Sequence, residues 1–160
     1  MPEVELELAD ADATRALGRR LATLLRAGDL VVLTGELGAG KTTLTQGLGK
    51  GLGVRGQVAS PTFVIARVHP SLGDGPALVH VDAYRLGSLD EVDALDLDTS
   101  LADSVTVVEW GAGLVEQLAG DRLEIDLVRP RGDAEDVPRR AVLRAHGRRW
   151  AGVDLAGALA

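Results

Sequence analysis

Apolar residues along the chain fall into two kinds of run, and each kind predicts a different class of β-strand. A continuous apolar run at residues 30–33 and mainly apolar runs at residues 77–81 and 105–108 are typical of strands buried on both faces of a parallel sheet. Residues 4–8 instead alternate apolar and polar side chains, which predicts a half-buried or edge strand. Three further strand-like runs lie at residues 62–68, 123–128 and 141–145. The last two are joined by a polar turn and are predicted to be an antiparallel pair or to flank the parallel sheet.

Apolar spacings of three and four predict an amphipathic helix near the N-terminus. Asp10 or Asp12 can cap its start, because a carboxylate accepts hydrogen bonds from the free backbone N–H groups there. The apolar face continues to about Arg26, and Gly28 is a plausible stop. A second amphipathic helix is expected at residues 41–52, with a glycine directly after it. Shorter helices are expected from residue 88, at residues 114–118 and at residues 150–160.

Composition predicts a single folded domain. The chain has 160 residues, of which 46% are hydrophobic and 26% charged, as is ordinary for one globular domain. No apolar run approaches the roughly 20 residues needed to cross a bilayer, and residues 1–5 have no basic or apolar stretch, so we expect no secretory signal there. The absence of cysteine excludes disulfides, thiolate metal sites and cysteine nucleophiles. We therefore expect residues 1–160 to form one cytoplasmic α/β domain with no membrane partner.

The net charge of the chain argues against one class of binding partner. The formal net charge of −7 disfavours nucleic-acid binding over the whole surface. Residues 129–149 nevertheless have an excess of arginine, which can contact RNA phosphate or an acidic partner, or simply line solvated strand edges. Of the 17 basic residues, only Lys41 and Lys50 are lysine, so the compact ammonium group is rare in this chain.

One motif carries specific chemistry. The pattern GxxxxGK followed by threonine is matched by Gly35, Glu36, Leu37, Gly38, Ala39, Gly40, Lys41 and Thr42. It follows a predicted buried strand and opens a predicted helix, as a P-loop requires. In a P-loop, backbone N–H groups bind phosphate oxygens, the lysine reaches the β- and γ-phosphates, and the hydroxyl can hold Mg²⁺. The sequence thus predicts a P-loop NTPase-like fold with a mostly parallel central sheet, flanking antiparallel strands and helices on both faces.

A P-loop also needs an acidic residue that holds or orients Mg²⁺. Asp82 and Glu109 each follow a predicted buried strand, and the carboxyl ends of parallel strands line the ligand crevice. Residue chemistry alone does not decide which of the two carboxylates holds or orients Mg²⁺. His80 precedes Asp82 by two residues, so both side chains lie on the same face of the strand. His80 can therefore orient Asp82, or it can be a packed structural histidine.

Four strings of residues occur in an order that resembles one family. They are residues 35–43 (GELGAGKTT), 60–63 (SPTF), 80–86 (HVDAYRL) and 108–111 (VEWG). Together they resemble the TsaE family, also called YjeE, the bacterial ATPases required for threonylcarbamoyladenosine modification of tRNA. The resemblance spans about residues 10–120.

The resemblance implies a small ATPase that uses Mg²⁺ and ATP and works with a complex of the TsaD and TsaB proteins. It implies that Thr42 and Glu109 hold Mg²⁺ and that Asp82 lies nearest the attacking water. Lys41, Asp82 and Glu109 are thus the expected catalytic residues, and residues 35–43, including Thr43, the expected ATP-binding segment. Positions expected at a switch loop or partner face are Ser60, Thr62, Tyr84, Arg85 and Trp110. Any tRNA contact is expected to be indirect or weak.

Two other functions are compatible with a P-loop. A small-molecule kinase would need an acceptor pocket and a lid, and no lid-sized insertion is visible in the sequence. A nucleotide-dependent switch would bind ATP tightly with negligible turnover. A GTPase is disfavoured, because the chain contains no asparagine and so lacks the usual guanine-reading Asn-Lys-x-Asp motif.

Overall fold

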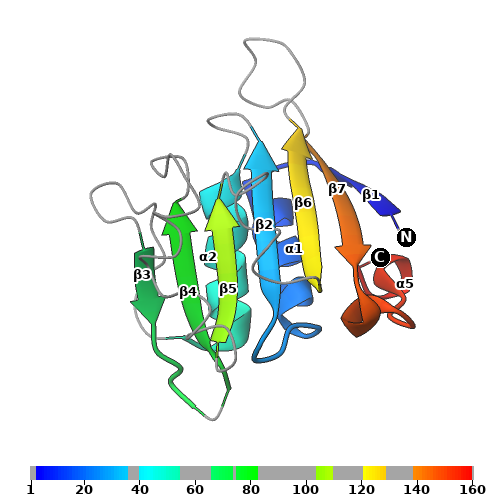
Figure 1. Cartoon of the computed structure of the whole chain (residues 1–160). Coiled ribbons are helices and arrows are strands. Elements are labelled where there is room, and N and C mark those ends of the chain that lie inside the picture. Colours follow the sequence, from blue (N-terminus) through cyan, green and yellow to red (C-terminus); the bar gives the residue numbers. More distant parts are fainter. Residues whose placement is uncertain are drawn as a thin grey trace.

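The computed structural model describes residues 3–35, 40–54, 66–73, 75–82, 104–109, 121–128 and 139–159. In chain order the elements are β1 (Glu3–Leu8), α1 (Ala11–Ala22), β2 (Leu30–Gly35), α2 (Lys41–Leu52), β3 (Ala66–His69), β4 (Ala77–Asp82), β5 (Ser104–Glu109), β6 (Arg122–Val128), β7 (Arg139–His146), a short 3-10 helix (Arg148–Trp150) and α5 (Leu155–Leu159). The strands form one seven-stranded sheet in the order β1-β7-β6-β2-β5-β4-β3 (Figure 1).

The centre of this sheet is parallel, as the mainly apolar runs at residues 30–33, 77–81 and 105–108 predict. β2 pairs in parallel with β5 on one side and with β6 on the other, and β4 pairs in parallel with β5. Antiparallel strands flank this centre, with β3 beside β4, β7 beside β6 and β1 beside β7. The predicted fold class, a P-loop NTPase-like α/β fold with a mostly parallel central sheet and flanking antiparallel strands, is therefore confirmed. The strands predicted at residues 123–128 and 141–145 are β6 and β7. They form an antiparallel pair and also flank the parallel centre, because β6 pairs in parallel with β2.

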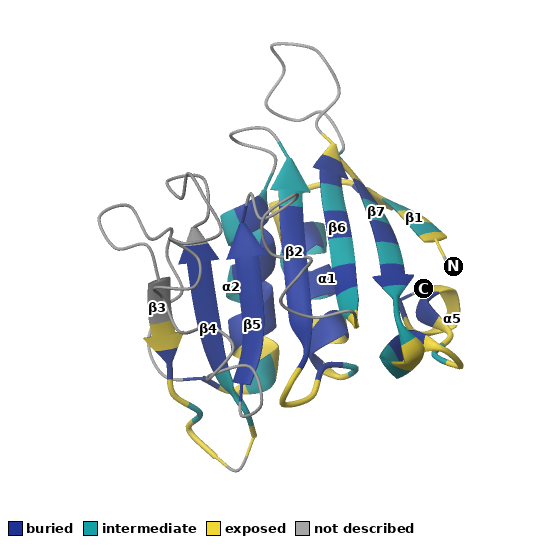
Figure 2. Cartoon of the chain, in the orientation of Figure 1, coloured by how far each residue is buried: buried dark blue, intermediate teal, exposed yellow. Residues whose placement is uncertain are grey.

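Burial along the strands follows the two kinds of apolar run. All six residues of β5 are buried, as are the first four of β2, so both faces of these strands are covered. β6 and β7 alternate between buried and partly exposed residues (Figure 2). The polar side chains of β6 and β7 therefore lie on a face of the sheet that solvent reaches.

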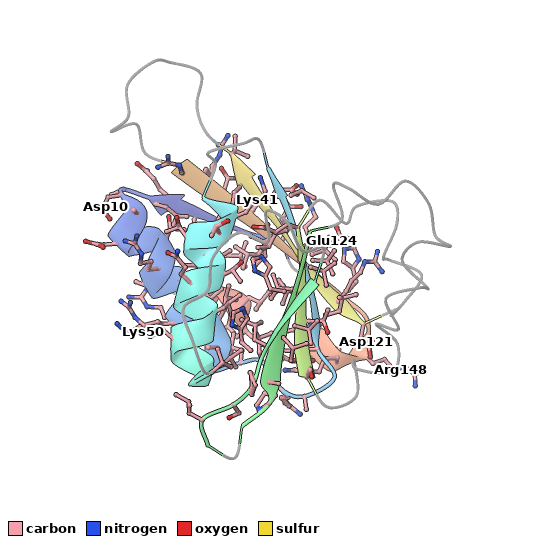
Figure 3. The ribbon with its side chains drawn as sticks, turned by 90° about the vertical axis from the view of Figure 1, so that its left-hand side faces the viewer. Asp10, Lys41, Lys50, Asp121, Glu124 and Arg148 are labelled. Atoms are coloured by element: carbon pink, nitrogen blue, oxygen red, sulfur yellow. The ribbon has the colours of Figure 1, made fainter. Side chains whose placement is uncertain are left out.

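Helices α1 and α2 lie side by side on one face of the sheet (Figures 1 and 3). Their apolar faces join the sheet in one core, which includes Leu17, Leu21, Leu44, Leu48, Val31, Leu33, Val107 and Ile125. The helices expected from residue 88 and at residues 114–118 fall outside the described residues, so helices on the second face stay a prediction.

The prediction that α1 runs to about Arg26 is wrong, because the helix ends at Ala22. Its start is as expected: Asp10 caps it by accepting a hydrogen bond from the Ala13 N–H over 2.8 Å. Near the other end, the Arg26 N–H donates to the Asp29 carboxylate over 2.7 Å instead of to a helical carbonyl. Gly28, with a φ of 97°, therefore lies in the turn before β2 and does not end the helix directly.

The C-terminal helix is also shorter than the predicted stretch 150–160. Gly152 has a φ of 91°, a left-handed conformation that interrupts a helix. The helix α5 begins only after Asp154, whose carboxylate accepts a hydrogen bond from the Gly157 N–H over 3.1 Å. None of the helices within the described ranges is long and apolar enough to cross a membrane.

Helices α1 and α2 approach so closely that glycines are required between them. A Cβ atom at Gly47 would overlap the Arg15 carbonyl oxygen, and one at Gly18 would overlap that of Leu44. A Cβ at Gly51 would lie 2.6 Å from the Cβ of Ala22, well inside contact distance. This contact fixes α2, the helix that opens at Lys41, against α1.

We expect Gly47→Ala to lower the free energy of unfolding by about 1–3 kcal/mol, because the new methyl group meets rigid backbone. Helix propensity alone predicts the opposite sign, a stabilisation of about 1 kcal/mol. Denaturant unfolding followed by circular dichroism measures the change. Gly73→Ala is the control, because a Cβ there meets no described atom within 4 Å. A Gly47→Ala chain as stable as the unsubstituted one would contradict the close approach.

Candidate functional site

The two described ends of the β2–α2 junction, Gly35 and Gly40, have backbone conformations that suit a glycine-rich loop. Gly40, the residue before α2, has a φ of 106°, which favours glycine because a Cβ would be strained there. As a glycine it has no side chain that could cap the helix, and a backbone hydrogen bond runs from the Leu44 N–H to the Gly40 carbonyl oxygen over 2.8 Å. Gly40 therefore does not cap the first N–H groups of α2, and free N–H groups at a helix N-terminus are suited to bind anions.

Lys41 connects the two ends of this loop. It is the first residue of α2 and is only 7% exposed. Its Nζ donates a hydrogen bond to the carbonyl oxygen of Gly35, the last residue of β2, over 2.8 Å. Figure 3 places Lys41 at one end of α2 and Lys50 at the other. Only one of the two lysine ammonium groups therefore lies at the loop.

Thr42 and Glu109 meet at the same edge of the sheet. Glu109 ends β5 and pairs in register with Leu33 of β2, so it lies beside the strand that leads into the loop. Glu109 is 3% exposed, and the Thr42 hydroxyl donates to its Oε1 over 3.5 Å. A hydroxyl and a carboxylate are hard oxygen donors of the kind that Mg²⁺ prefers.

This pair fits a metal ion that arrives with a nucleotide. Mg²⁺ in nucleotide sites takes one or two side chains and completes its shell with phosphate oxygens and water. Among the described residues, no group of three or more histidine, aspartate and glutamate side chains could hold a metal. Thr42 and Glu109 are therefore suited to Mg²⁺ bound jointly with phosphate.

The second carboxylate oxygen of Glu109 faces a histidine. His80 Nε2 lies 3.5 Å from Glu109 Oε2, and the His80 side chain is fully buried, with 0% exposure. The sequence linked His80 to Asp82, whereas its described contact is with Glu109. Asp82 pairs in backbone register with Glu109 at the ends of β4 and β5, and its side chain lies outside the described part.

Several predicted site residues also lie outside the described residues. Gly35, Gly40, Lys41, Thr42, Thr43 and Glu109 are described, and Lys41, Thr42 and Glu109 converge as reported above. The residues not described are Glu36, Leu37, Gly38, Ala39, Ser60, Thr62, Tyr84, Arg85 and Trp110. Their roles stay predictions.

A polar chain that sequence reasoning missed leads away from the loop across the sheet. Thr34, next to Gly35 in β2, donates its hydroxyl to Asp126 of β6. Arg144 of β7 donates to Asp126 over 2.6 Å and to Glu3 of β1 over 3.3 Å. The hydrogen bond and charge of Asp126 raise the pKa of the Arg144 guanidinium above its ordinary value. Alternating polar residues in strands signal such contacts, but only the strand order reveals the partners.

At least three of the seven arginines within residues 129–149 pair with carboxylates in the part of the chain that the structure describes: Arg140, Arg144 and Arg149. Arg140 pairs with Glu5 over 2.7 Å on the exposed strand β1. Arg149 pairs with the buried Asp29 over 2.9 Å and lies over the Trp150 ring, 4.3 Å from its centroid. These pairs favour the interpretation that this segment supplies solvated strand edges and local anchors.

A parallel sheet whose central strand leads through this loop into a helix, with an acidic residue on the adjacent strand, defines the P-loop class of folds. The family model "Threonylcarbamoyl adenosine biosynthesis protein TsaE" matches residues 8–139. The chain therefore belongs to the TsaE family.

Individual relatives agree with this assignment. A tRNA threonylcarbamoyladenosine biosynthesis protein TsaE from Streptomyces coelicolor is 69% identical over 142 residues, covering 88% of this chain and 96% of the relative. The TsaE of Bacillus subtilis is 36% identical over 144 residues, or 89% of this chain and 88% of the relative. The crystal structure of Bacillus subtilis YdiB matches with a TM-score of 0.74 and 31% identity, over 99% of this chain and 94% of that one.

Proposed function

We propose that this protein binds and hydrolyses ATP with Mg²⁺ in the cytoplasm and supports threonylcarbamoyladenosine modification of tRNA together with the TsaD and TsaB proteins. One observation carries the proposal: Lys41, Thr42 and Glu109 converge at the β2–α2 junction of a chain that matches the TsaE family model. The relatives are named for the biosynthesis of this tRNA modification.

Phosphoryl transfer to water needs positioning and charge neutralisation more than covalent chemistry. Lys41 would exchange its Gly35 carbonyl partner for phosphate oxygens, and the N–H groups at the start of α2 would bind further oxygens. Thr42 and Glu109 would hold Mg²⁺, which neutralises phosphate charge when bound. We assign Asp82, beside Glu109 in register, to the attacking water.

The proposed function is tested by comparing ATP hydrolysis in the absence and in the presence of the TsaD–TsaB complex. Phosphate release from ATP is measured for the purified protein alone and with the TsaD and TsaB proteins of its own species. We expect slow release alone and at least about 10-fold stimulation by the complex, because a partner can supply a P-loop NTPase with a missing catalytic group such as an arginine.

Two other results would overturn the proposal in distinguishable ways. Bound ATP with no release in either sample would indicate a nucleotide-dependent switch. Transfer of the γ-phosphate to a metabolite would identify a kinase. Both outcomes are separated from hydrolysis by following the labelled γ-phosphate on thin-layer chromatography.

A further inference from the structure

His80 is a buried polar residue whose ring nitrogens are unsatisfied. Its side chain has 0% exposure, and neither Nδ1 nor Nε2 has a hydrogen-bond partner in the part of the chain that the structure describes. Burial of an unsatisfied polar group costs roughly 1–3 kcal/mol. An apolar side chain at this place in β4 would avoid the cost, so the histidine calls for an explanation.

The arrangement around Glu109 supplies that explanation. The two oxygens of the carboxylate face different residues: Oε1 lies 3.5 Å from the Thr42 hydroxyl, and Oε2 lies 3.5 Å from His80 Nε2. The oxygen nearer His80 is therefore not the one that faces the loop. The separation of 3.5 Å exceeds an ordinary N–H···O hydrogen bond by about 0.5 Å, so the two atoms need only a shift of about that size to form one. Hydrogen bonds in ligand-free sites commonly tighten in this way when the ligand binds.

We propose that His80 is a positioning residue for Glu109: its Nε2–H donates to Oε2 and so holds Oε1 toward Thr42, where Mg²⁺ would bind. The inference rests on the proposed function, because it assumes that Glu109 holds Mg²⁺. Outer partners of this kind fix the orientation of a ligating carboxylate, and their loss costs about 10- to 100-fold in metal affinity.

A second histidine–glutamate pair on the same sheet provides a matched control. His146 Nε2 lies 3.3 Å from Glu124 Oε2, on β7 and β6. Both side chains of this pair are about a quarter exposed, and Glu124 also pairs with Arg122, so water and a guanidinium stabilise the carboxylate without the imidazole. Substitution of His146 therefore tests what loss of a histidine does to the sheet away from the loop.

The experiment compares His80→Leu, His80→Gln, His80→Asn and the control His146→Leu. Glutamine places an N–H donor near the position of Nε2, whereas asparagine places one near Nδ1. Calorimetry measures Mg²⁺ affinity at saturating ADP, and separately the ADP affinity in EDTA. We expect His80→Leu and His80→Asn to weaken Mg²⁺ binding by about 10-fold or more. His80→Gln and His146→Leu should stay within about 3-fold of the unsubstituted chain, and ADP affinity in EDTA should not change.

Two other outcomes can be distinguished: one overturns the role of His80 alone, and the other also overturns the proposed function. Equal Mg²⁺ affinity in the glutamine and asparagine variants, or in His80→Leu and the unsubstituted chain, overturns the His80 assignment alone. No Mg²⁺-dependent binding by the unsubstituted chain overturns the proposed function as well. If the variants fail to fold, ¹⁵N spectra of the unsubstituted chain with Mg²⁺ and ADP show which ring nitrogen of His80 carries the proton. We expect a proton on Nε2. A proton on Nδ1 alone would overturn the assignment.

Discussion

Replacement of Lys41 by alanine should weaken ATP binding by about 100-fold or more. Lys41 lies at the start of α2, and its ammonium already donates a hydrogen bond to the Gly35 carbonyl at the mouth of the loop. A hydrogen bond to a charged group contributes about 1.5–3 kcal/mol, and the ammonium can make more than one to the β- and γ-phosphates. A loss of about 3 kcal/mol corresponds to roughly 100-fold in affinity. Calorimetric titration with a non-hydrolysable ATP analogue measures it.

Lys50→Ala is the matched control for this prediction. Lys50 is the only other lysine of the chain, and it is exposed near the opposite end of the same helix (Figure 3). Its removal deletes the same charge without touching the loop, so nucleotide affinity should stay within about twofold. If Lys41→Ala and Lys50→Ala bind the analogue equally well, the β2–α2 junction is not the phosphate site.

Glu109→Gln should abolish the effect of Mg²⁺ while sparing binding of the nucleotide itself. Glutamine keeps the size of the buried side chain but removes the charge that a metal ion needs, beside the Thr42 hydroxyl 3.5 Å away. Loss of a metal that neutralises transition-state charge removes several kcal/mol of stabilisation. We therefore expect Mg²⁺-dependent phosphate release, measured with TsaD and TsaB present, to fall by about 100-fold or more.

The control for Glu109 is Glu124→Gln on β6. Glu124 also faces a histidine but is about a quarter exposed and pairs with Arg122 away from the loop. Phosphate release by this variant should match that of the unsubstituted chain. Undiminished release by Glu109→Gln would mean that another carboxylate holds the metal, with Asp82 the first candidate because it pairs with Glu109 in register.

Local signals were sufficient to predict most of the elements. The bounds 41–52 of α2 were correct, because glycines with positive φ, Gly40 and Gly53, flank an amphipathic run on both sides. The end of α1 was missed because the apolar spacing continues to Leu25. Directly after it, the Arg26 N–H donates a hydrogen bond to the Asp29 carboxylate instead of to a carbonyl of the helix, so the chain forms a turn. Such competition between a side chain and a backbone carbonyl leaves no trace in apolar periodicity.

Pairing between strands was not predictable from local pattern. Asp82 and Glu109 both end buried strands, and only the order β2-β5-β4 shows that Glu109 lies next to the strand entering the loop. The contact between His80 and Glu109 likewise joins side chains from different strands, whereas sequence reasoning could relate His80 only to its neighbour two residues away. Strand order depends on the packing of the whole chain, so these partners require the structure.

Lys41, Thr42 and Glu109 should together form one site for ATP with Mg²⁺. Titration of the unsubstituted protein with a non-hydrolysable ATP analogue, once with Mg²⁺ and once with EDTA, tests it most directly. We expect one saturable site per chain in both conditions, with affinity at least about 10-fold higher when Mg²⁺ is present. Absence of saturable binding with Mg²⁺, or identical affinity with Mg²⁺ and with EDTA, would contradict it.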